Sequence, residues 1–369
     1  MKNIVAYSEN ADSIKAFEEV KAQIDEAGSP VLIIFCAPGD KFNYFAEEFY
    51  NAYPKAQSIG ATGYYSYSSK GFSVDALSAL VVYDGIECAT GALFEISHFP
   101  MRYVPAIEKA VASLSSEDNT VGIAFSTAYG NCEELVQDTF REVLGKKNIP
   151  VVGGTAGGPT PASKTLVALN GMVYEEAAVF VLIRNLKGSY FIYKENIYRP
   201  TKTMVTATDV DCEERIVYEY DERPAKDVIQ RVLRADEKDL LETFSDHPMG
   251  RITGDEIYIT SCNRINKDGS IGYFARIYNQ TRLYVLEPDD LDKVWAETAA
   301  RVHEKIEKPS MCFTVNCFLR AMYFDKVGRN SDFNSFLAEG FGNHVGLTGF
   351  GEQFNYEHFN QTMVMVVFE

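Results

Sequence analysis

The sequence VVGGTAGGP at residues 151–159 contains a motif that occurs three times along this chain of 369 residues. The related stretches are SIGATGYYS at residues 58–66 and HVGLTGFGE at residues 344–352. Each has an apolar residue, then Gly-x-Thr, then Gly or Ala. Self-similarity of this kind indicates a supersecondary unit that the fold uses more than once. The glycines and threonines of the three motifs are Gly60 and Thr62, Gly153 and Thr155, and Gly346 and Thr348.

The same elements surround each motif. An apolar run of strand length precedes the motif and another follows it, without clean polar alternation, which is typical of strands covered on both faces. Helical periodicity precedes the first strand and also fills the interval between that strand and the motif. The predicted strands are 31–36 and 76–83, 121–126 and 177–183, and 311–317 and 362–368. The predicted helices are 11–27 and 42–50, 103–114 and 132–144, and 291–306, 318–324 and 332–338.

These patterns predict an α/β protein with mixed, largely buried β-sheets and packed helices. It is built from repeated helix-strand-helix-strand-strand units. In the helix 132–144 we expect Asn131 to be the N-cap and Gly145 to end the helix.

The length of the chain favours two domains, because one hydrophobic core seldom serves more than about 300 residues. A polar stretch rich in Thr and Asp at residues 198–214 marks the boundary. We therefore predict an N-terminal domain of residues 1–197 and a C-terminal domain of residues 198–369. The second should contain a helix that starts near Pro224 and a hairpin with its turn at Lys267–Gly269.

Composition excludes several classes of function. The net charge of −17 argues against nucleic acid and anionic membranes as partners, since both require clustered Lys and Arg. The N-terminus lacks the apolar stretch of a signal peptide, and no window has the roughly 20 apolar residues of a membrane helix. We therefore expect a cytoplasmic protein without membrane insertion. The seven cysteines are scattered, which indicates reduced thiols and no zinc site.

Several short stretches, in this order, resemble the FIST N-terminal and FIST C-terminal domains. They are IGATG, PVVGGTAGG, RPAKDVI, KDGSI, EPDDL, NCFLR and GFGEQFNYEHFNQTMVMVVF. The resemblance covers nearly the whole chain and implies a sensory protein of bacterial or archaeal signalling. FIST domains occur alone or fused to chemotaxis receptors, histidine kinases and cyclic-dinucleotide enzymes. The family implies recognition of a small ligand, with an amino acid the usual proposal. Because the sequence shows no such output segment, we expect a separate signalling partner of one of these kinds.

The stretch NCFLR provides the first candidate ligand-binding residues, Asn316, Cys317 and Arg320. It matches a Cys-x-x-Arg pattern of the family's C-terminal domain. Arg320 would hold a carboxylate with a bidentate pair of hydrogen bonds. The alternative is an interdomain salt bridge beside a buried thiol.

The repeated motif provides further candidates, namely Thr62, Thr155, Thr348 and Gly349. In the functional interpretation, glycines with positive φ expose main-chain N–H groups that bind a carboxylate. In the structural interpretation, the fold itself requires these tight segments. Repetition favours the second, because a fold constraint recurs in every copy whereas a site need not.

Polar residues interleaved with aromatic ones near the C-terminus complete the predicted pocket. They are Glu352, Asn360 and Gln361, in the stretch GEQFNYEHFNQT. The alternative is a hairpin tip whose polar side chains cap turns.

Two other functions have to be weighed. One branch of the family is reported to bind haem, for which His344 or His358 would be the axial ligand. A cysteine-dependent enzyme would use Cys36, Cys262 or Cys317 as nucleophile. The chain has no GxSxG or HExxH motif. We therefore expect a sensor that is not an enzyme and carries no metal or cofactor, with haem as the alternative cofactor.

Overall fold

The computed structural model describes all residues from Met1 to Glu369, and they form two compact units. Unit 1 contains Met1–Lys194, Thr298–His358 and Met363–Glu369. Unit 2 contains Glu195–Glu297 and Phe359–Thr362. Each unit is described by itself.

The two units differ from the predicted domains in where the residues after Glu297 belong. The predicted boundary at 197/198 is close to the division between Lys194 and Glu195. However, the residues from Thr298 onward return to unit 1, so residues 198–369 are not one compact unit. Unit 2 is thus an insertion between the second and third copies of the repeat.

Unit 1 contains three six-stranded sheets whose strand orders follow one scheme. Each sheet has one edge strand, then the last, first and second strands of one repeat, and finally a hairpin. The first is β1 (Asn3–Ser8), β6 (Leu77–Val82), β2 (Leu32–Ala37), β3 (Gln57–Thr62), β10 (Val167–Leu169) and β11 (Met172–Tyr174). The second is β7 (Ile86–Phe94), β12 (Ala177–Asn185), β8 (Thr120–Ser126), β9 (Val151–Thr155), β24 (Gly351–Phe354) and β25 (Glu357–Phe359). The third is β13 (Tyr190–Asn196), β26 (Thr362–Phe368), β22 (Met311–Cys317), β23 (Asn343–Gly349), β4 (Ser66–Ser68) and β5 (Gly71–Ser73).

The strand directions confirm the predicted repeat and the mixed sheets. In the first repeat, β2 is parallel to β3 and antiparallel to β6. In the second, β8 is parallel to β9 and antiparallel to β12. In the third, β22 is parallel to β23 and antiparallel to β26. All three copies therefore have the same topology.

The hairpins were not predicted, because each joins the sheet of a different repeat. The hairpin β4–β5 follows β3 in the chain but pairs with β23. The hairpin β10–β11 follows β9 but pairs with β3, and β24 follows β23 but pairs with β9. Each repeat thus completes the sheet of another in a closed cycle, which is why the third repeat belongs to unit 1.

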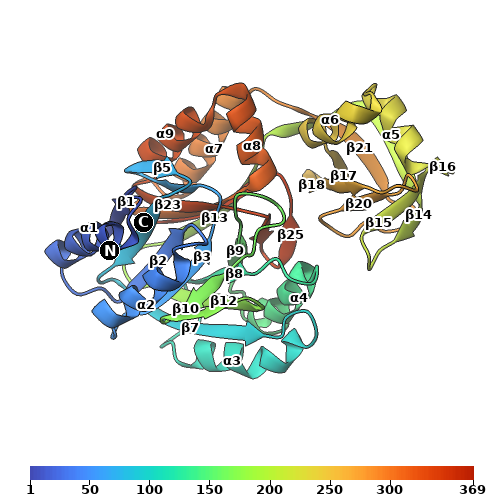
Figure 1. The fold of residues 1–369 in the computed structure, drawn as a ribbon. Helices are drawn as coiled ribbons and strands as arrows, with labels where there is room; N and C mark the ends of the chain where they lie inside the picture. The colour runs from blue at the N-terminus through green and yellow to red at the C-terminus, as the bar shows by residue number, and fades with distance from the viewer. The chain divides into compact units, whose positions relative to one another are not determined.

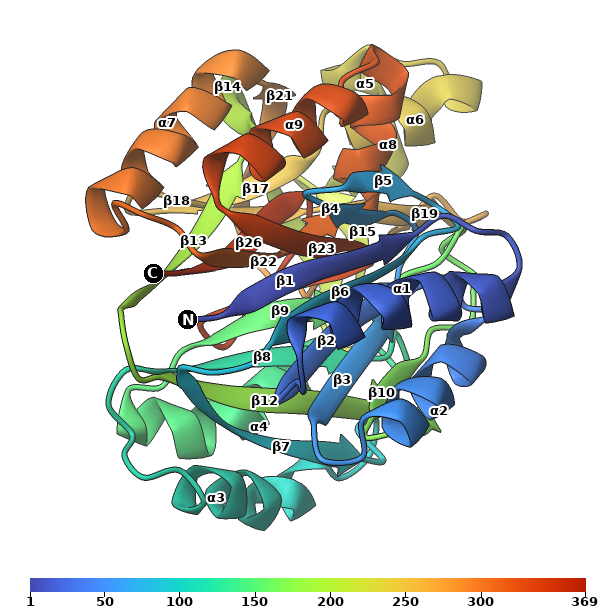
Figure 2. The ribbon, with the colours of Figure 1, turned by 90° about the vertical axis from the view of Figure 1, so that its left-hand side faces the viewer.

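One apolar core joins the inner faces of the three sheets. It includes Ile34 of β2, Ile123 of β8 and Phe313 of β22. The next residue along each strand points to the opposite face, where helices cover it. Phe35, for example, packs on Phe42, the first residue of the helix that follows β2. Figures 1 and 2 show helices on the outer faces, with α3 and α4 at one end of unit 1 and α7, α8 and α9 at the other. Buried strands covered on both faces explain the continuous apolar runs.

The helices lie close to their predicted ranges, with one difference at an end. They are α1 (Ser13–Ala27), α2 (Phe42–Ala52), α3 (Val104–Ala112), α4 (Glu133–Leu144), α7 (Leu291–Lys305), α8 (Phe318–Val327) and α9 (Asn330–Gly340). Asn131 is not the N-cap of α4, because it has a positive φ of 51° and Cys132 occupies the cap position. Beyond α4, Gly145 starts a short 3-10 turn, and Asn148 adopts the left-handed conformation that ends it.

Unit 2 is an antiparallel sheet with two short helices. Its core includes Val217 and Tyr220 of the sheet and Val228 and Phe244 of the helices. The predicted hairpin is present between β19 and β20, with Gly269 at φ 87° in its turn. The elements are β14 (Tyr198–Asp211), β15 (Ile216–Tyr220), β16 (Arg223–Pro224), α5 (Ala225–Leu233), α6 (Leu240–Asp246), β17 (Met249–Thr253), β18 (Glu256–Thr260), β19 (Cys262–Ile265), β20 (Ile271–Tyr273) and β21 (Arg282–Pro288). None of the helices in the structure has the length and apolar character needed to span a membrane.

The three repeated motifs meet inside unit 1 through a ring of main-chain hydrogen bonds. The amide of Gly157 donates to the carbonyl of Thr62 at 2.7 Å, and the amide of Phe350 donates to the carbonyl of Thr155 at 3.0 Å. The amide of Tyr64 closes the ring by donating to the carbonyl of Thr348 at 3.0 Å. In every case the donor lies two residues after the threonine of another copy.

Close approach, and not positive φ, explains the glycines of the motif. None of Gly60, Gly153 and Gly346 has a positive φ. A Cβ at Gly153 would lie 1.8 Å from the carbonyl oxygen of Ala124 on the neighbouring strand. At Gly60 it would lie 2.3 Å from the ring of Phe35. The motif therefore allows tight packing where three repeats converge.

We predict that Gly153→Ala lowers the free energy of unfolding by about 3 kcal/mol or more, because the contact it creates is with backbone. Urea denaturation would measure this. Gly340→Ala is the control, since a Cβ there meets nothing within 4 Å. Its stability should be unchanged or rise by up to about 1 kcal/mol. Equal losses in the two variants would contradict the packing explanation.

Candidate functional site

The structure buries every predicted site residue but divides the set between the two units. Asn360 and Gln361 belong to unit 2, where the Gln361 side-chain amide donates to the carbonyl of Ser245 at 3.1 Å. The others lie in unit 1, and each is no more than 2% exposed or is a buried glycine. The unit 1 residues are Thr62, Thr155, Asn316, Cys317, Arg320, Thr348, Gly349 and Glu352.

The threonines of the three motifs occupy one register position, which allows the copies to be compared. Thr62 pairs with Ala37, Thr155 pairs with Ser126, and Thr348 pairs with Asn316. Parallel neighbours in register point to the same face of a sheet. Each pair lies at the carboxyl end of its parallel strands, which is where α/β sheets bind ligands.

In the first two copies the side chains at this position are used by the fold. The Thr62 hydroxyl accepts a hydrogen bond from the Leu166 amide at 3.1 Å. Thr155 lies 3.4 Å from the hydroxyl of Ser126, which in turn accepts a bond from Gln353 at 2.8 Å. Both threonines therefore have structural partners.

The third copy differs at Asn316, which stands where the first two copies have Ala37 and Ser126 and whose side-chain amide has no hydrogen-bond partner. Its side chain is 0% exposed, and neither its amide nitrogen nor its carbonyl oxygen is bonded. A buried amide without partners costs about 1–3 kcal/mol. Such a group in a native fold indicates a missing partner, such as a ligand or an ordered water.

Arg320 is fixed close by in sequence and is the largest of the fully buried side chains. It lies in the first turn of α8, which begins directly after β22 ends at Cys317. The guanidinium carbon lies 5.1 Å from the ring centre of Phe324 and 5.4 Å from that of Phe333. Two aromatic faces thus hold a positive charge in the interior, where a carboxylate would interact strongly with it.

Tyr67 of β4 lies close to Arg320 and Phe333, although no sequence pattern points to it. It is 0% exposed, and its hydroxyl donates to Asn330 of α9 at 2.8 Å. Its ring meets that of Phe333 edge-on at 5.4 Å. Burial raises the pKa of Tyr67, so it remains a neutral phenol. The exchanged hairpin brings Tyr67 here, and no local sequence signal reports such an exchange.

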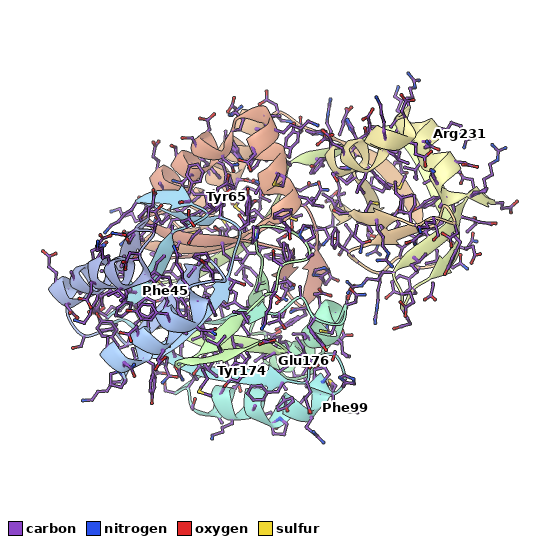
Figure 3. All side chains as sticks on the ribbon, in the orientation of Figure 1. Phe45, Tyr65, Phe99, Tyr174, Glu176 and Arg231 are labelled. Carbon is purple, nitrogen blue, oxygen red and sulfur yellow. The ribbon has the colours of Figure 1, made fainter.

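The neighbouring Tyr65, labelled in Figure 3, connects the same hairpin segment to α8. Its hydroxyl donates to Asp325 at 3.0 Å. A side chain from the first repeat therefore also holds the exposed side of α8.

The main-chain hydrogen bonds agree with the structural interpretation of the motifs, which repetition favoured, and not with the functional one, in which free N–H groups bind an anion. The amide of Thr62 donates to Leu166 at 3.0 Å, and that of Thr348 donates to Tyr65 at 2.9 Å. The amide of Ala156, after Thr155, donates to Ser126 at 2.7 Å. Because the fold uses these groups, any anion recognition has to come from side chains.

The cysteines do not have the environment of a nucleophile. Burial raises the pKa of Cys36, and it raises the pKa of Cys262 to about 12. A thiolate is the reactive form, and neither residue forms it near neutral pH. Cys317 is also buried, with 2% of its surface exposed.

Of the two histidines considered for haem, His344 does not have the surroundings of an axial ligand. His344 is 0% exposed, and its Nε2 shares a hydrogen bond of 2.9 Å with Thr314. The ring of His358 packs directly over Gly351, where a Cβ would come within 2.3 Å of it. A haem needs an open face beside the ligating nitrogen, which the buried ring of His344 lacks, whereas His358 is half-buried.

Comparison with protein families supports the resemblance found in the sequence. The model of the FIST N domain matches residues 30–223, and the model of the FIST C domain matches residues 225–355. A search of curated proteins finds no match to this chain.

We predict that Asn316→Leu raises the free energy of unfolding without ligand by about 1–3 kcal/mol, because it removes a buried amide that has no partner. Asn330→Leu is the matched control. Asn330 accepts from Tyr67 and donates to the carbonyl of Ala321 at 3.3 Å, so its loss should destabilise. Urea denaturation of both variants measures the difference. Similar destabilisation by both would mean that Asn316 is bonded like Asn330.

His344 should make stability depend on pH. Burial lowers its pKa from 6.5 to about 3. Between these values the unfolded chain binds a proton that the folded protein does not. Stability should therefore fall by an additional ~1.4 kcal/mol per pH unit below pH 6.5, and be unaffected above it. Unfolding of His344→Gln at pH 6.5, 5.5 and 4.5 should lack this slope, whereas His98→Gln should keep it, since the His98 side chain is 67% exposed. Identical slopes in both variants would contradict this assignment.

Proposed function

Because the chain belongs to the FIST family, whose domains are sensory modules of signal transduction that bind small ligands, we propose that it senses an amino acid or a related carboxylate. It acts as a binding protein without catalysis and passes the signal to a separate partner. The proposed partner is a histidine kinase, a chemotaxis receptor or a cyclic-dinucleotide enzyme. We propose that this takes place in the cytoplasm of a prokaryotic cell.

The observation that best supports the proposal is that the third repeat differs from the other two repeats at Asn316. The fold needs the threonine of the motif in every copy, and the first two copies give its neighbourhood internal partners. Asn316, the register partner of Thr348, stands where the first two copies have Ala37 and Ser126, and its side-chain amide has no hydrogen-bond partner. A structural requirement would have recurred in all copies, so this position is best explained by binding.

The charged and polar side chains of the candidate site indicate which class of ligand would bind. Arg320 supplies a fixed, buried positive charge for a carboxylate. Asn316 supplies two donors and an acceptor. Glu352, which is 0% exposed, pairs in register with Gly154 of β9 and already interacts within the protein, is the acidic group that we propose for an ammonium. Together these groups match the two charged ends of an amino acid.

Burial connects binding to a conformational change. Asn316 and Arg320 are both 0% exposed, so a ligand reaches them only when α8 moves. A ligand that binds better to the opened state shifts the population toward it. The outer side of α8 presents Met322 and Val327, exposed by 40% and 42%, and a partner can detect the movement there.

A thermal-shift screen of the amino acids and related carboxylates, with an absorption spectrum of the same sample, tests the proposal. A ligand present at about 100 times its Kd should stabilise the protein by about 2.7 kcal/mol, which raises Tm by several degrees. Asn316→Leu and Arg320→Gln should lose this shift. Thr62→Val is the matched control from the first repeat and should keep it.

Two results would overturn the proposal. One is the absence of any shift across the panel. The other is a Soret band, which would make a haem-based nitric oxide sensor the better explanation. Retention of the full shift in Asn316→Leu would move the ligand away from the third repeat.

A further inference from the structure

A cavity of about 450 Å³ lies at the carboxyl ends of β2 and β3, and none of the residues assigned to the carboxylate site lines it. One wall includes Pro38, which directly follows β2, and Tyr64, which lies two residues after β3. The opposite wall includes Pro159 and Leu166, from the segment between β9 and β10. The volume is in the range of small-molecule sites, which span about 300–1,000 Å³.

The apolar walls are held in place by the fold. The Tyr64 ring lies 4.6 Å from that of Tyr65 and 5.3 Å from that of Phe318, while the Tyr64 amide belongs to the ring of hydrogen bonds. In the facing segment, Thr160 and Ser163 bond to each other, with the Ser163 amide donating to the Thr160 carbonyl at 2.9 Å. Walls that are already ordered bind a ligand with less loss of entropy.

The charges around the cavity favour a cation. Asp40 and Asp75 line it, and neither carboxylate makes an ion pair or a hydrogen bond within the protein. The one lysine of the lining, Lys164, is neutralised by Glu175 at 2.5 Å. The cavity thus presents two negative charges beside apolar walls and an aromatic ring, and aromatic faces also attract cations.

We propose that this cavity binds a small organic amine, with its ammonium group near Asp40 and Asp75 and its apolar body against Pro38, Pro159 and Tyr64. This is a second ligand site of unit 1, and its chemistry is the opposite of that at Arg320. It does not depend on the carboxylate proposal. Because Tyr64 also contacts Phe318, the first residue of α8, an amine in the cavity would be connected through Tyr64 to the helix that carries Arg320.

Isothermal titration of the full chain with phenethylamine and hexylamine tests this site. Each amine should bind with saturation, whereas the uncharged 2-phenylethanol and the acid 3-phenylpropanoate should bind at least about tenfold more weakly, a difference of about 1.4 kcal/mol. The double variant Asp40→Asn/Asp75→Asn should lose amine affinity by a similar factor. These side chains are exposed, so the variant should fold normally.

The matched control is Asp138→Asn/Glu142→Gln, which removes the same charge from the exposed face of α4. It should bind amines like the wild type. Asn316→Leu should also keep amine binding, even though it loses the response to amino acids, so the two proposals fail independently. Amine binding that is absent, equal to that of the alcohol, or unchanged in the Asp40/Asp75 variant would overturn the proposal.

Discussion

Unit 1 depends on the convergence of three strand ends, where each threonine carbonyl accepts the amide of another repeat. The three bonds, from Gly157 to Thr62, from Phe350 to Thr155 and from Tyr64 to Thr348, form a closed cycle. Chains can meet this closely only if no side chain intervenes. A Cβ at Gly349 would lie 2.3 Å from the carbonyl oxygen of Thr155, and one at Gly157 would lie 2.5 Å from that of Thr348. The small residues of the motif and the exchanged hairpins both follow from this geometry.

The sequence was sufficient to predict the repeat, because it is written in local patterns. Apolar runs such as residues 31–36 and the motif after them recur with each copy, and the helices between them have clear periodicity. The hairpin exchange could not be predicted, since the pairing of β4 with β23 joins segments more than 270 residues apart. The domain boundary could not be predicted for the same reason, because it depends on contacts between distant segments of the chain. Residues 198–369 look continuous along the chain, yet the third repeat closes a cycle begun by the first.

For the site, the sequence predicts which residues are candidates, but it does not predict which of their side chains are already hydrogen-bonded within the fold. Asn316 and Arg320 were selected from NCFLR, and both are buried where β22 ends and α8 begins. Which of the repeated polar positions is available for binding depends on partners from other segments. Leu166 satisfies Thr62, and Ser126 lies beside Thr155, but these partners follow from the fold and not from the motif. Tyr67 was missed for the same reason, because the exchanged hairpin delivers it.

The cycle of three hydrogen bonds also connects the two proposed ligand sites, one for a carboxylate and one for an amine, to the same helix, α8. Tyr64 lines the amine cavity with its ring, and its amide holds the carbonyl of Thr348, the register partner of Asn316. A ligand that displaces Tyr64 therefore acts on the end of β23 at Thr348, which is paired with Asn316, and through Phe318 on the start of α8. Packed interiors respond to such shifts as units, because they lack free space to absorb them. Occupation of either site should consequently change the free energy of opening α8, and coupling of this kind is reciprocal.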